Sequence, residues 1–326
     1  MILSSSNIFA IQSKVAFETV CLDIFRYQAE RCEFYRAYLK NLGVNPLEIK
    51  AIENIPFLPI RFFKERKVYS AAKPEEVTFT SSSTTGTGES KHFVSDISIY
   101  EESFRRGFQQ FYGEPNRHTI LALLPSYLER NGSSLIYMVE DLIKQSGKSD
   151  SGFFLYNHGE LFDRLNRLKK AGESCVLIGV SFALLDFAEH YPINFPELIV
   201  METGGMKGHR KEMVREELHG VLCKGFGVEN IHSEYGMTEC LSQAYSKGRG
   251  LYRCPPWMKV MVRDIYAPFN YVQYGVTGGV NIIDLANIYS CSFIETQDLG
   301  KANEDGFFEI LGRFDNSDIR GCNLMV

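Results

Sequence analysis

The sequence predicts an α/β fold in which a mostly parallel sheet with flanking helices is followed by a smaller β-rich part. Between Thr119 and Glu234, apolar runs of strand length alternate with segments of helical periodicity, which is typical of β-α-β units. After Gly250 this periodicity gives way to short β-rich runs separated by glycine and aspartate turns. The chain has 326 residues, 44% of them hydrophobic, which suffices for one large domain or two ordinary ones.

Residues 1–77 are expected to be a helical region that ends in an extended connector. Apolar residues recur at roughly helical intervals from Ile8 to Leu42, and Gly43 follows as a stop signal, which predicts one long helix or two shorter ones. The segment Ile55–Ile60 contains two prolines, and each proline restricts the residue before it. This segment is therefore predicted to be extended.

The elements that follow can be assigned in order. The parallel strands are expected at Thr119–Leu124, Phe153–Tyr156, Cys175–Val180, Leu198–Glu202 and Asn230–Ser233. The helices between them are expected at Ser133–Gln145, Glu160–Lys170, Phe182–His190 and Arg210–Lys224. An antiparallel sheet or small barrel is expected from Lys259–Ile265, Gly279–Leu285, Phe293–Glu295 and Phe307–Leu311. We therefore divide the chain into a helical region (1–77), an α/β core (78–250), a β-rich subdomain (251–315) and a tail (316–326).

Composition excludes several classes of protein. The net charge of −5 provides no basic field of the kind that attracts nucleic acid. No segment approaches the ~20 uninterrupted apolar residues of a membrane span, and the first residues lack the features of a secretory signal. The eight cysteines contain no C-x-x-C pair, which argues against a disulfide framework or a thiolate zinc site. We expect reduced thiols, a cytoplasmic location and no nucleic-acid partner.

A loop rich in hydroxyl groups follows the connector. Six consecutive serines and threonines at positions 80–85 precede Gly86, Gly88 and Lys91. Backbone N–H groups exposed by glycines, hydroxyl donors and an ammonium group suit a polyphosphate, although the Walker spacing is absent. A flexible surface loop explains this segment equally well when it is taken alone.

Four further segments favour the phosphate-binding interpretation of this loop, because they follow it in a fixed order. They are 202–207 (ETGGMK), 233–239 (SEYGMTE), 295–300 (ETQDLG) and 308–315 (FEILGRFD). Tyr235 offers a stacking face, Glu239 a hard oxygen ligand for Mg²⁺, Asp298 an acceptor for ribose hydroxyls and Arg313 a charged donor. Each residue alone has an ordinary structural explanation, but together they describe an ATP site.

These segments resemble the ordered core motifs of the adenylate-forming enzymes, the superfamily of acyl-CoA synthetases, peptide-synthetase adenylation domains and firefly luciferase. The resemblance runs from Thr78 to Asp315. Within the superfamily, the segments SSSTTG, TGGMKG and RGCNL are similar to the acyl-protein synthetases of bacterial luminescence fatty-acid reductase complexes. The resemblance implies the large N-terminal-type domain of these enzymes, with ATP and Mg²⁺ as cofactors and a carboxylic acid as substrate.

The resemblance also implies roles for individual residues. The ATP phosphates would be held by Ser82, Ser83, Thr84, Thr85 and Gly86. The adenine would be flanked by Gly204, Gly205 and the Tyr235-Gly236 turn. Thr238 would contact the α-phosphate, Glu239 would hold Mg²⁺, Asp298 would bind the ribose hydroxyls, and Arg313 would lie near the ribose. The chain departs from the usual pattern at Ser83 and Gln297, where the family has glycine, and in its lack of the usual proline–lysine pair after the loop.

The chain ends 11 residues after Asp315, so we expect the mobile lid domain of the superfamily, with its catalytic lysine, to be absent. Lys91 or Lys207 would then assist adenylation, unless Mg²⁺ and the loop suffice. Cys322 lies two residues after Arg320 near the end of the chain, where a neighbouring guanidinium can lower the pKa of a thiol. The resemblance implies that this cysteine carries the acyl group, whereas an inert surface thiol is the alternative.

The sequence therefore predicts ATP-dependent activation of a carboxylic acid, expected to be a fatty acid, to an acyl-adenylate with release of pyrophosphate. The acyl group would pass to Cys322 and then to a partner, either an acyl-accepting reductase or a carrier protein. Two alternatives stay open at this point. One is a ligase that uses coenzyme A or a carrier protein as an external thiol, and the other is a non-catalytic nucleotide-binding scaffold.

Overall fold

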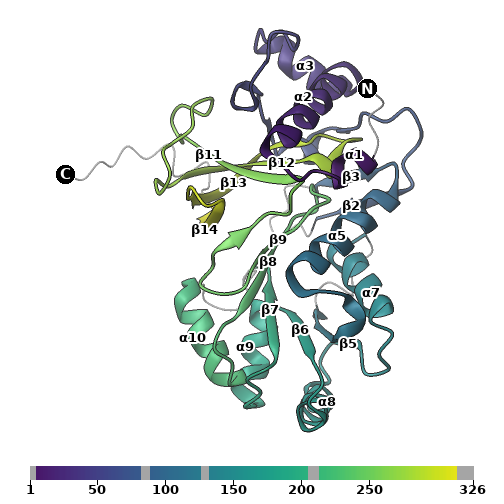
Figure 1. The fold of residues 1–326 in the computed structure, drawn as a ribbon, viewed down its shortest axis with the longest axis vertical. Coiled ribbons are helices and arrows are strands. Elements are labelled where there is room, and N and C mark those ends of the chain that lie inside the picture. Colours follow the sequence, from purple (N-terminus) through teal and green to yellow (C-terminus); the bar gives the residue numbers. More distant parts are fainter. Residues whose placement is uncertain (1–4, 82–88, 126–131, 205–212, 314–326) are drawn as a thin grey trace, which may run out of the picture. The chain divides into compact units, whose positions relative to one another are not determined.

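The computed structural model describes residues 5–81, 89–125, 132–204 and 213–313 of the chain (Figure 1). By its internal contacts the chain divides into two compact units. The α/β-unit comprises residues 78–91 and 96–255, and the β-unit comprises residues 1–77, 92–95 and 256–326. Within the described residues, no helix is both long and apolar enough to cross a bilayer.

The α/β-unit is built on a sheet with the strand order β5-β4-β6-β7-β8-β9-β10. The strands are β4 (Thr119–Leu123), β5 (Gly152–Phe154), β6 (Cys175–Val180), β7 (Ile199–Thr203), β8 (His232–Tyr235), β9 (Ala244–Ser246) and β10 (Tyr252–Arg253). The first five positions of the sheet are parallel, whereas β9 and β10 are antiparallel. Every residue of β4 and β6 is buried, as expected for strands covered on both faces.

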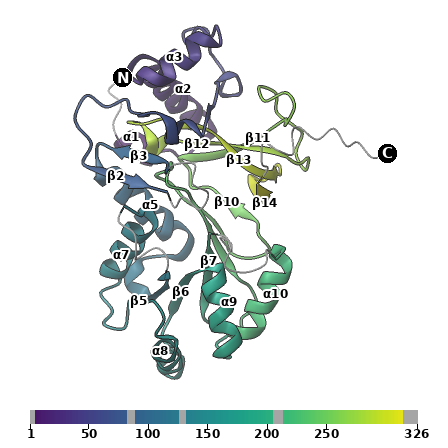
Figure 2. The same ribbon diagram turned by 180° about the vertical axis from the view of Figure 1, so that it is seen from behind.

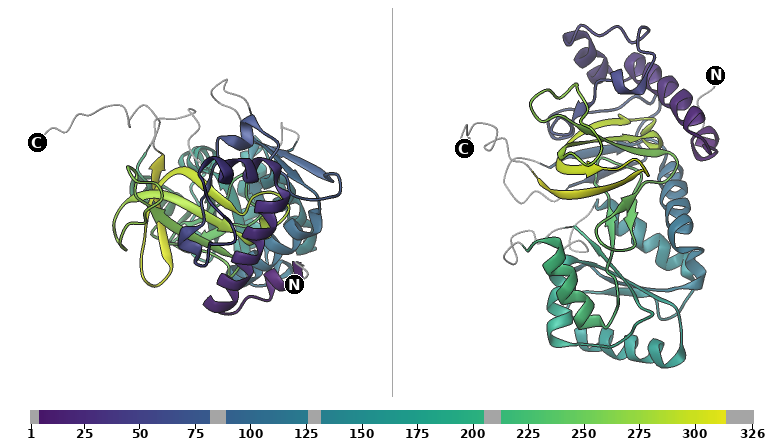
Figure 3. Two further views of the ribbon diagram at one scale, coloured as in Figure 1. Left: turned by 90° about the horizontal axis from the view of Figure 1, so that it is seen from above. Right: turned by 60° about the vertical axis from the view of Figure 1, so that its left-hand side comes forward.

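Helices cover both faces of this sheet (Figures 2 and 3). On one face lie α5 (Ile97–Tyr112) and α7 (Ser134–Ser146), and on the other α8 (His158–Ala171), α9 (Ser181–His190) and α10 (Arg215–Phe226). The chain order reverses between β4 and β6, and ligands of open α/β sheets bind beyond the carboxyl ends of the strands at such a point. The fold therefore directs attention to the residues that follow β4, β6, β7 and β8.

The β-unit contains an antiparallel sheet of β11 (Met258–Arg263), β12 (Gly278–Asp284), β13 (Phe293–Ala302) and β14 (Phe307–Arg313). The short strand β1 (Leu58–Pro59) pairs parallel to β13. Helices α2 (Lys14–Arg31) and α3 (Glu33–Asn41) pack on this sheet, because the rings of Phe25 and Tyr35 lie 5.8 and 6.2 Å from the ring of Phe293. A sheet with one face covered by aromatic packing is thus the core of this unit.

Short elements complete the described chain. They are α1 (Ser5–Phe9), α4 (Phe62–Glu65), the 3-10 turns η1 (Ile52–Asn54), η2 (Pro115–Arg117) and η3 (Leu285–Asn287), and the two-stranded sheet of β2 (Val77–Thr80) and β3 (Lys91–Val94).

The predicted α/β fold class and the predicted strands and helices are confirmed, with shifts of a few residues at most ends. Of the two options for residues 8–42, two helices in place of one long helix is correct, since α2 ends at Arg31 and α3 begins at Glu33. The later part of the chain forms an antiparallel sheet. The largest difference is β13, which was expected to end at Glu295 and continues to Ala302. The structure places the N-terminal helices in the same unit as β11–β14, a grouping that the four-part division did not include.

Candidate active site

The carboxyl ends of β6, β7 and β8 bring hydroxyl and carboxyl groups together in the α/β-unit. Ser181, the first residue after β6, donates hydrogen bonds to Glu202 Oε2 (3.1 Å) and to the backbone oxygen of Gly204 (2.9 Å). Thr203 Oγ1, at the end of β7, donates to Glu234 Oε2 at 2.5 Å. Gly204 has a positive φ of 69°, a conformation that glycine adopts without strain. These bonds fix the strand ends from which the next turns begin.

Glu234 is the most unusual carboxyl group of this cluster. It is only 8% exposed, and burial, with a contribution from the neighbouring carboxylate of Glu202, raises its pKa to about 7. The bond from Thr203 opposes this shift, because it favours the charged form. A Cβ atom on Gly236 would clash with Glu234 Oε1, so the carboxyl group lies close to the Tyr235-Gly236 turn and would have to move if residue 236 carried a side chain.

The turn after β8 carries the residues predicted to contact the nucleotide. The ring of Tyr235 lies edge-on to that of Tyr252 at 5.8 Å, and the guanidinium of Arg215 lies 5.2 Å from the ring of Tyr252. Glu239 is 6% exposed and follows within four residues on the same turn, whereas Thr238 is half-buried. Tyr235 therefore packs against Tyr252 of β10, and Arg215 of α10 contacts that same Tyr252 ring.

The two ends of the hydroxyl-rich loop are tied together. Ser81 N donates to the backbone oxygen of Ser90 at 3.0 Å, and Ser90 N donates to Ser81 Oγ at 2.9 Å. Gly132, which follows β4 and has a φ of 84°, accepts a hydrogen bond from Thr80 N at 2.8 Å through its backbone oxygen. The base of the loop is thus anchored beside the segment that leaves β4.

In the β-unit, Asp298 and Arg313 face each other across β13 and β14. They are register partners, and Arg313 Nε donates to Asp298 Oδ1 at 2.9 Å. The side chain of Asp298 is 6% exposed and that of Arg313 is 74% exposed. Asp298 N donates to Thr296 Oγ1 at 3.1 Å. One hydrogen bond thus holds the backbone of Asp298 and another holds its carboxylate.

A family model described as acyl-protein synthetase, LuxE, matches residues 2–326. The chain belongs to the acyl-protein synthetase (LuxE) family. It is therefore an acid–thiol ligase, and the resemblance inferred from the motifs is confirmed. No curated protein sequence matches the chain.

Several solved structures have a similar fold. A 2-hydroxyisobutyryl-CoA ligase, solved with 2-HIB-AMP and CoA, is similar with a TM-score of 0.68 and 14% identity over 93% of this chain and 70% of its own. ATP-bound MatB from Rhodopseudomonas palustris has a TM-score of 0.57 and 17% identity over 76% of this chain and 49% of its own. A luciferase-like enzyme from the mealworm Zophobas morio has a TM-score of 0.52 and 14% identity over 74% of this chain and 58% of its own. The chain thus has the fold of these enzymes and spans about half the length of MatB.

The structure brings some of the predicted site residues of this synthetase together. In the α/β-unit, Gly204 follows β7, Tyr235 is the last residue of β8, and Gly236, Thr238 and Glu239 come directly after it. In the β-unit, Asp298 and Arg313 are hydrogen-bonded partners. Lys91 is exposed at the first position of β3. The remaining predicted residues lie outside the described residues: Ser82, Ser83, Thr84, Thr85, Gly86, Gly205, Lys207 and Cys322.

Sequence reasoning missed several residues that the structure places beside this site. Ser181 belongs to none of the predicted elements or motifs, and Thr203 and Glu234 are parts of motifs in which they have no predicted role of their own. A partial signal was present, since an acidic residue in a strand buried on both faces is rare unless it has a partner. The partner, Thr203, comes from a neighbouring strand and could not be identified without the register of β7 against β8.

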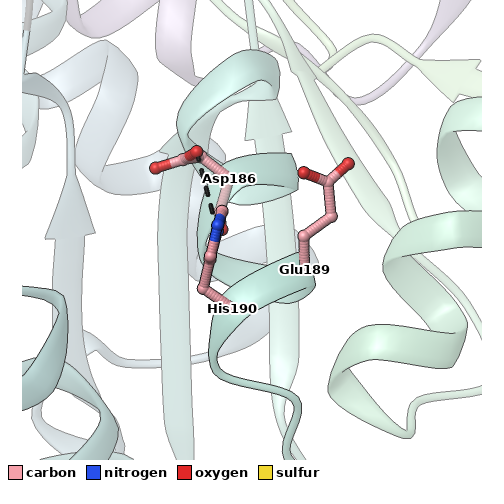
Figure 4. Close-up of side chains that lie close together, drawn as sticks. All are labelled: Asp186, Glu189 and His190. Atoms are coloured by element: carbon pink, nitrogen blue, oxygen red, sulfur yellow. Dashed lines mark hydrogen bonds and ion pairs between the residues drawn. The ribbon is translucent and has the colours of Figure 1, made fainter.

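A second group of ligand-type side chains lies on α9, at a different place in the α/β-unit. Asp186, Glu189 and His190 offer atoms within 4.8 Å of one another (Figure 4). Asp186 already lies 3.8 Å from His190 Nδ1 and 3.7 Å from His158 Nδ1, and Glu189 and His190 are exposed. The contacts of Asp186 with these two histidines account for the cluster. No disulfide joins the seven cysteines in the described part of the chain.

Proposed function

We propose that this synthetase activates a fatty acid with ATP, transfers the acyl group to Cys322 as a thioester, and delivers it to an acyl-accepting reductase. The observation that carries the proposal is the family match over residues 2–326. The fold shared with ligases that were solved with ATP or with an acyl-adenylate supports the first step. The hydrogen-bonded Asp298 and the packed Tyr235 are side chains of the types that bind a ribose and an adenine.

In the adenylation step, a carboxylate oxygen of the acid attacks the α-phosphorus of ATP. The bond to the bridging oxygen of pyrophosphate breaks, and that oxygen leaves with the electron pair. Tyr235 would pack against the adenine, and Asp298 Oδ2 would accept hydrogen bonds from ribose hydroxyls while Oδ1 holds Arg313. Thr238 would donate to the α-phosphate, and the ammonium group of Lys91 or Lys207 would lie near the leaving pyrophosphate.

The family implies Mg²⁺ at Glu239. A carboxylate oxygen is a ligand that this hard cation prefers. Glu239 is buried, so its side chain has little conformational freedom left to lose when it binds a metal ion. The donor type therefore fits. When bound, Mg²⁺ would neutralise charge on the phosphates, while the residues of the chain orient the two reactants.

In the transfer step, the thiolate of Cys322 attacks the acyl carbon, and AMP leaves with the electron pair of the mixed anhydride. The products are an acyl thioester and AMP, and the thiol proton passes to solvent. The acyl group then moves by the same chemistry to a thiol of the partner. The seven described cysteines are poorer candidates for this role, because none of them is exposed. Burial also raises the pKa of five of them, namely Cys21, Cys32, Cys175, Cys223 and Cys291, which disfavours the thiolate.

The test combines two measurements on the full chain. Acid-dependent exchange of labelled pyrophosphate into ATP is measured over straight-chain acids of increasing length, with the wild type and Cys322→Ser. We expect exchange with long-chain acids in both proteins, and covalent acyl label in the wild type alone. Label on Cys322→Ser at the wild-type rate would exclude this cysteine as carrier. Release of AMP that requires added CoA would favour an external thiol, and absent exchange with intact AMP binding would indicate a scaffold.

A further inference from the structure

The β-unit contains a buried arginine that is bound to the motif strand by several hydrogen bonds. Arg263, the last residue of β11, is 3% exposed. Its Nη1 donates to the backbone oxygen of Val280 and to Asn281 Oδ1, both at 2.9 Å, and its Nη2 donates to the backbone oxygen of Thr296 at 2.8 Å. Burying a guanidinium is costly unless its donors are satisfied, so this arrangement is a specific one.

These bonds converge on a bulge in β13. The flanking register pairs are Asn281 with Glu295 and Gly279 with Leu299. Between them β12 contributes one residue, Val280, whereas β13 contributes three, at positions 296–298. Bulges of this kind change the direction of a side chain and are frequent beside active sites. The three residues of β13 that lie opposite Val280 are those of the Thr-x-Asp motif, Thr296 to Asp298.

The bulge leaves the carbonyl oxygen of Val280 to be satisfied by side chains. It accepts hydrogen bonds from Arg263 Nη1 (2.9 Å) and from Thr296 Oγ1 (2.7 Å). The same Thr296 hydroxyl accepts the hydrogen bond from Asp298 N at 3.1 Å. A continuous set of contacts therefore runs from the guanidinium of Arg263 through Thr296 to the backbone of Asp298.

The space for the guanidinium is provided by a glycine. A Cβ atom on Gly279, the register partner of Arg263, would lie 2.5 Å from Arg263 Cζ. A lysine at position 263 would keep the charge but could not donate in two directions from one planar group. The absence of a side chain at Gly279 thus makes room for the guanidinium of Arg263, which forms the hydrogen bonds at the bulge.

We propose that Arg263 is a positioning residue for nucleotide recognition: it fixes the bulge that directs the Asp298 carboxylate toward the ribose. The inference rests on the proposed function, in which Asp298 binds the ribose hydroxyls. Arg263 itself does not contact the nucleotide. Its effect is transmitted through the backbone oxygen of Thr296 and the Thr296 hydroxyl.

A purely structural role and a positioning role differ in what they do to nucleotide choice. If Arg263 only stabilises the sheet, its replacement lowers stability and affects every nucleotide alike. If it positions Asp298, the loss falls on nucleotides that carry ribose hydroxyls. The ratio of kcat/KM for ATP to that for 2′,3′-dideoxy-ATP, in acid-dependent pyrophosphate exchange, separates the two.

The variants are Arg263→Lys and Thr296→Val, with Ile282→Val as the control. Thr296→Val keeps the shape of the side chain and removes only the hydroxyl, so it carries the test if Arg263→Lys fails to fold. Ile282 is fully buried on β12 and has no part in the contacts to Asp298, so its variant loses stability alone. Each protein is assayed as the full chain, together with its melting temperature.

In the wild type we expect ATP to be preferred by about a hundredfold or more, from two hydrogen bonds to a charged acceptor. Thr296→Val and Arg263→Lys should lower this ratio about five- to tenfold or more, while the rate with 2′,3′-dideoxy-ATP changes little. Ile282→Val should keep the wild-type ratio. An unchanged ratio in both test variants would overturn the inference and leave the proposed function intact. A wild-type ratio near one would overturn the role of Asp298 itself.

Discussion

The two units each hold a carboxyl group in an almost buried position, but they surround it differently. In the β-unit, Asp298 is bonded to the guanidinium of Arg313 and to the Thr296 hydroxyl through its backbone. In the α/β-unit, Glu234 is bonded to a neutral hydroxyl and has a second carboxylate, Glu202, nearby. Two carboxyl groups of similar burial therefore have different neighbours, a guanidinium in one case and a hydroxyl group with a second carboxyl group in the other.

The difference has a functional meaning. Asp298 is arranged as an acceptor with a charge-assisted partner, as a group that binds ribose hydroxyls needs to be. Glu234 has a pKa raised to about 7, so a large fraction of it is protonated at neutral pH. Its carboxyl group lies close to the Tyr235-Gly236 turn. One carboxyl group is suited to binding and the other to holding a turn.

The largest expected effect tests the binding role. Replacing Asp298 by alanine should lower kcat/KM for ATP in pyrophosphate exchange about a thousandfold, because two hydrogen bonds to a charged group are each worth about 1.5–3 kcal/mol. The guanidinium of Arg313 is exposed, so the loss of its partner should change the stability of the folded protein little.

The matched control is Glu309→Ala. Glu309 lies on the same β13–β14 hairpin and pairs with Lys301 at 3.2 Å, so its removal also takes away a carboxylate beside a cation. We expect kcat/KM for ATP to stay within about twofold of the wild type, as for most exposed ion pairs. Equal losses in both variants would mean that Asp298 has no particular role.

The second effect concerns the pH dependence of stability. The pKa of Glu234 rises from 4.5 to about 7 on folding, so between these values the folded state holds a proton that the unfolded state has lost. The free energy of unfolding should therefore fall by about 3 kcal/mol as pH rises through this window, and stay level above it. Urea unfolding at pH values across the window measures the slope.

Glu234→Gln should remove this part of the slope, because the amide imitates the protonated acid and does not titrate. Glu140→Gln is the control, since Glu140 forms an exposed pair with Lys144 on α7. It should leave the slope as in the wild type. A Glu234→Gln protein whose pH dependence matches that of the wild type would contradict the protonated state.

The smallest effect concerns the exposed half of the Asp298 pair. Arg313→Met should lower kcat/KM for ATP less than about fivefold, because an ion pair with one side chain 74% exposed is worth about 0–1 kcal/mol. Steady-state kinetics with ATP as the varied substrate gives the ratio. A loss as large as that of Asp298→Ala would instead place Arg313 in direct contact with the nucleotide.

The sequence predicted the fold of the α/β-unit well, since its strands and helices have distinct periodicities and β4 and β6 are continuous apolar runs. The motif residues Tyr235, Glu239 and Asp298 could be named because their types suit nucleotide binding. Their supporting residues could not be named in the same way. Arg263 lies 33 residues before Thr296 in the chain, and only the register of three strands brings them together.

The bulge shows most clearly what the sequence lacked. Gln297 breaks the usual Thr-Gly-Asp pattern, and β13 was expected to stop at Glu295. The strand instead continues through the motif because Val280, Arg263 and Thr296 satisfy the hydrogen bonds that the irregular register leaves open. That compensation involves side chain to backbone contacts across strands, which leave no periodic signal in the sequence.

An isotope measurement shows whether the carboxylate of an acid attacks the α-phosphorus of ATP. The full chain is incubated with ATP, Mg²⁺ and a long-chain acid whose carboxylate carries oxygen-18, and the AMP formed is analysed by mass spectrometry. We expect AMP that contains one oxygen from the acid. Unlabelled AMP, or label in inorganic phosphate with ADP as the nucleotide product, would contradict it.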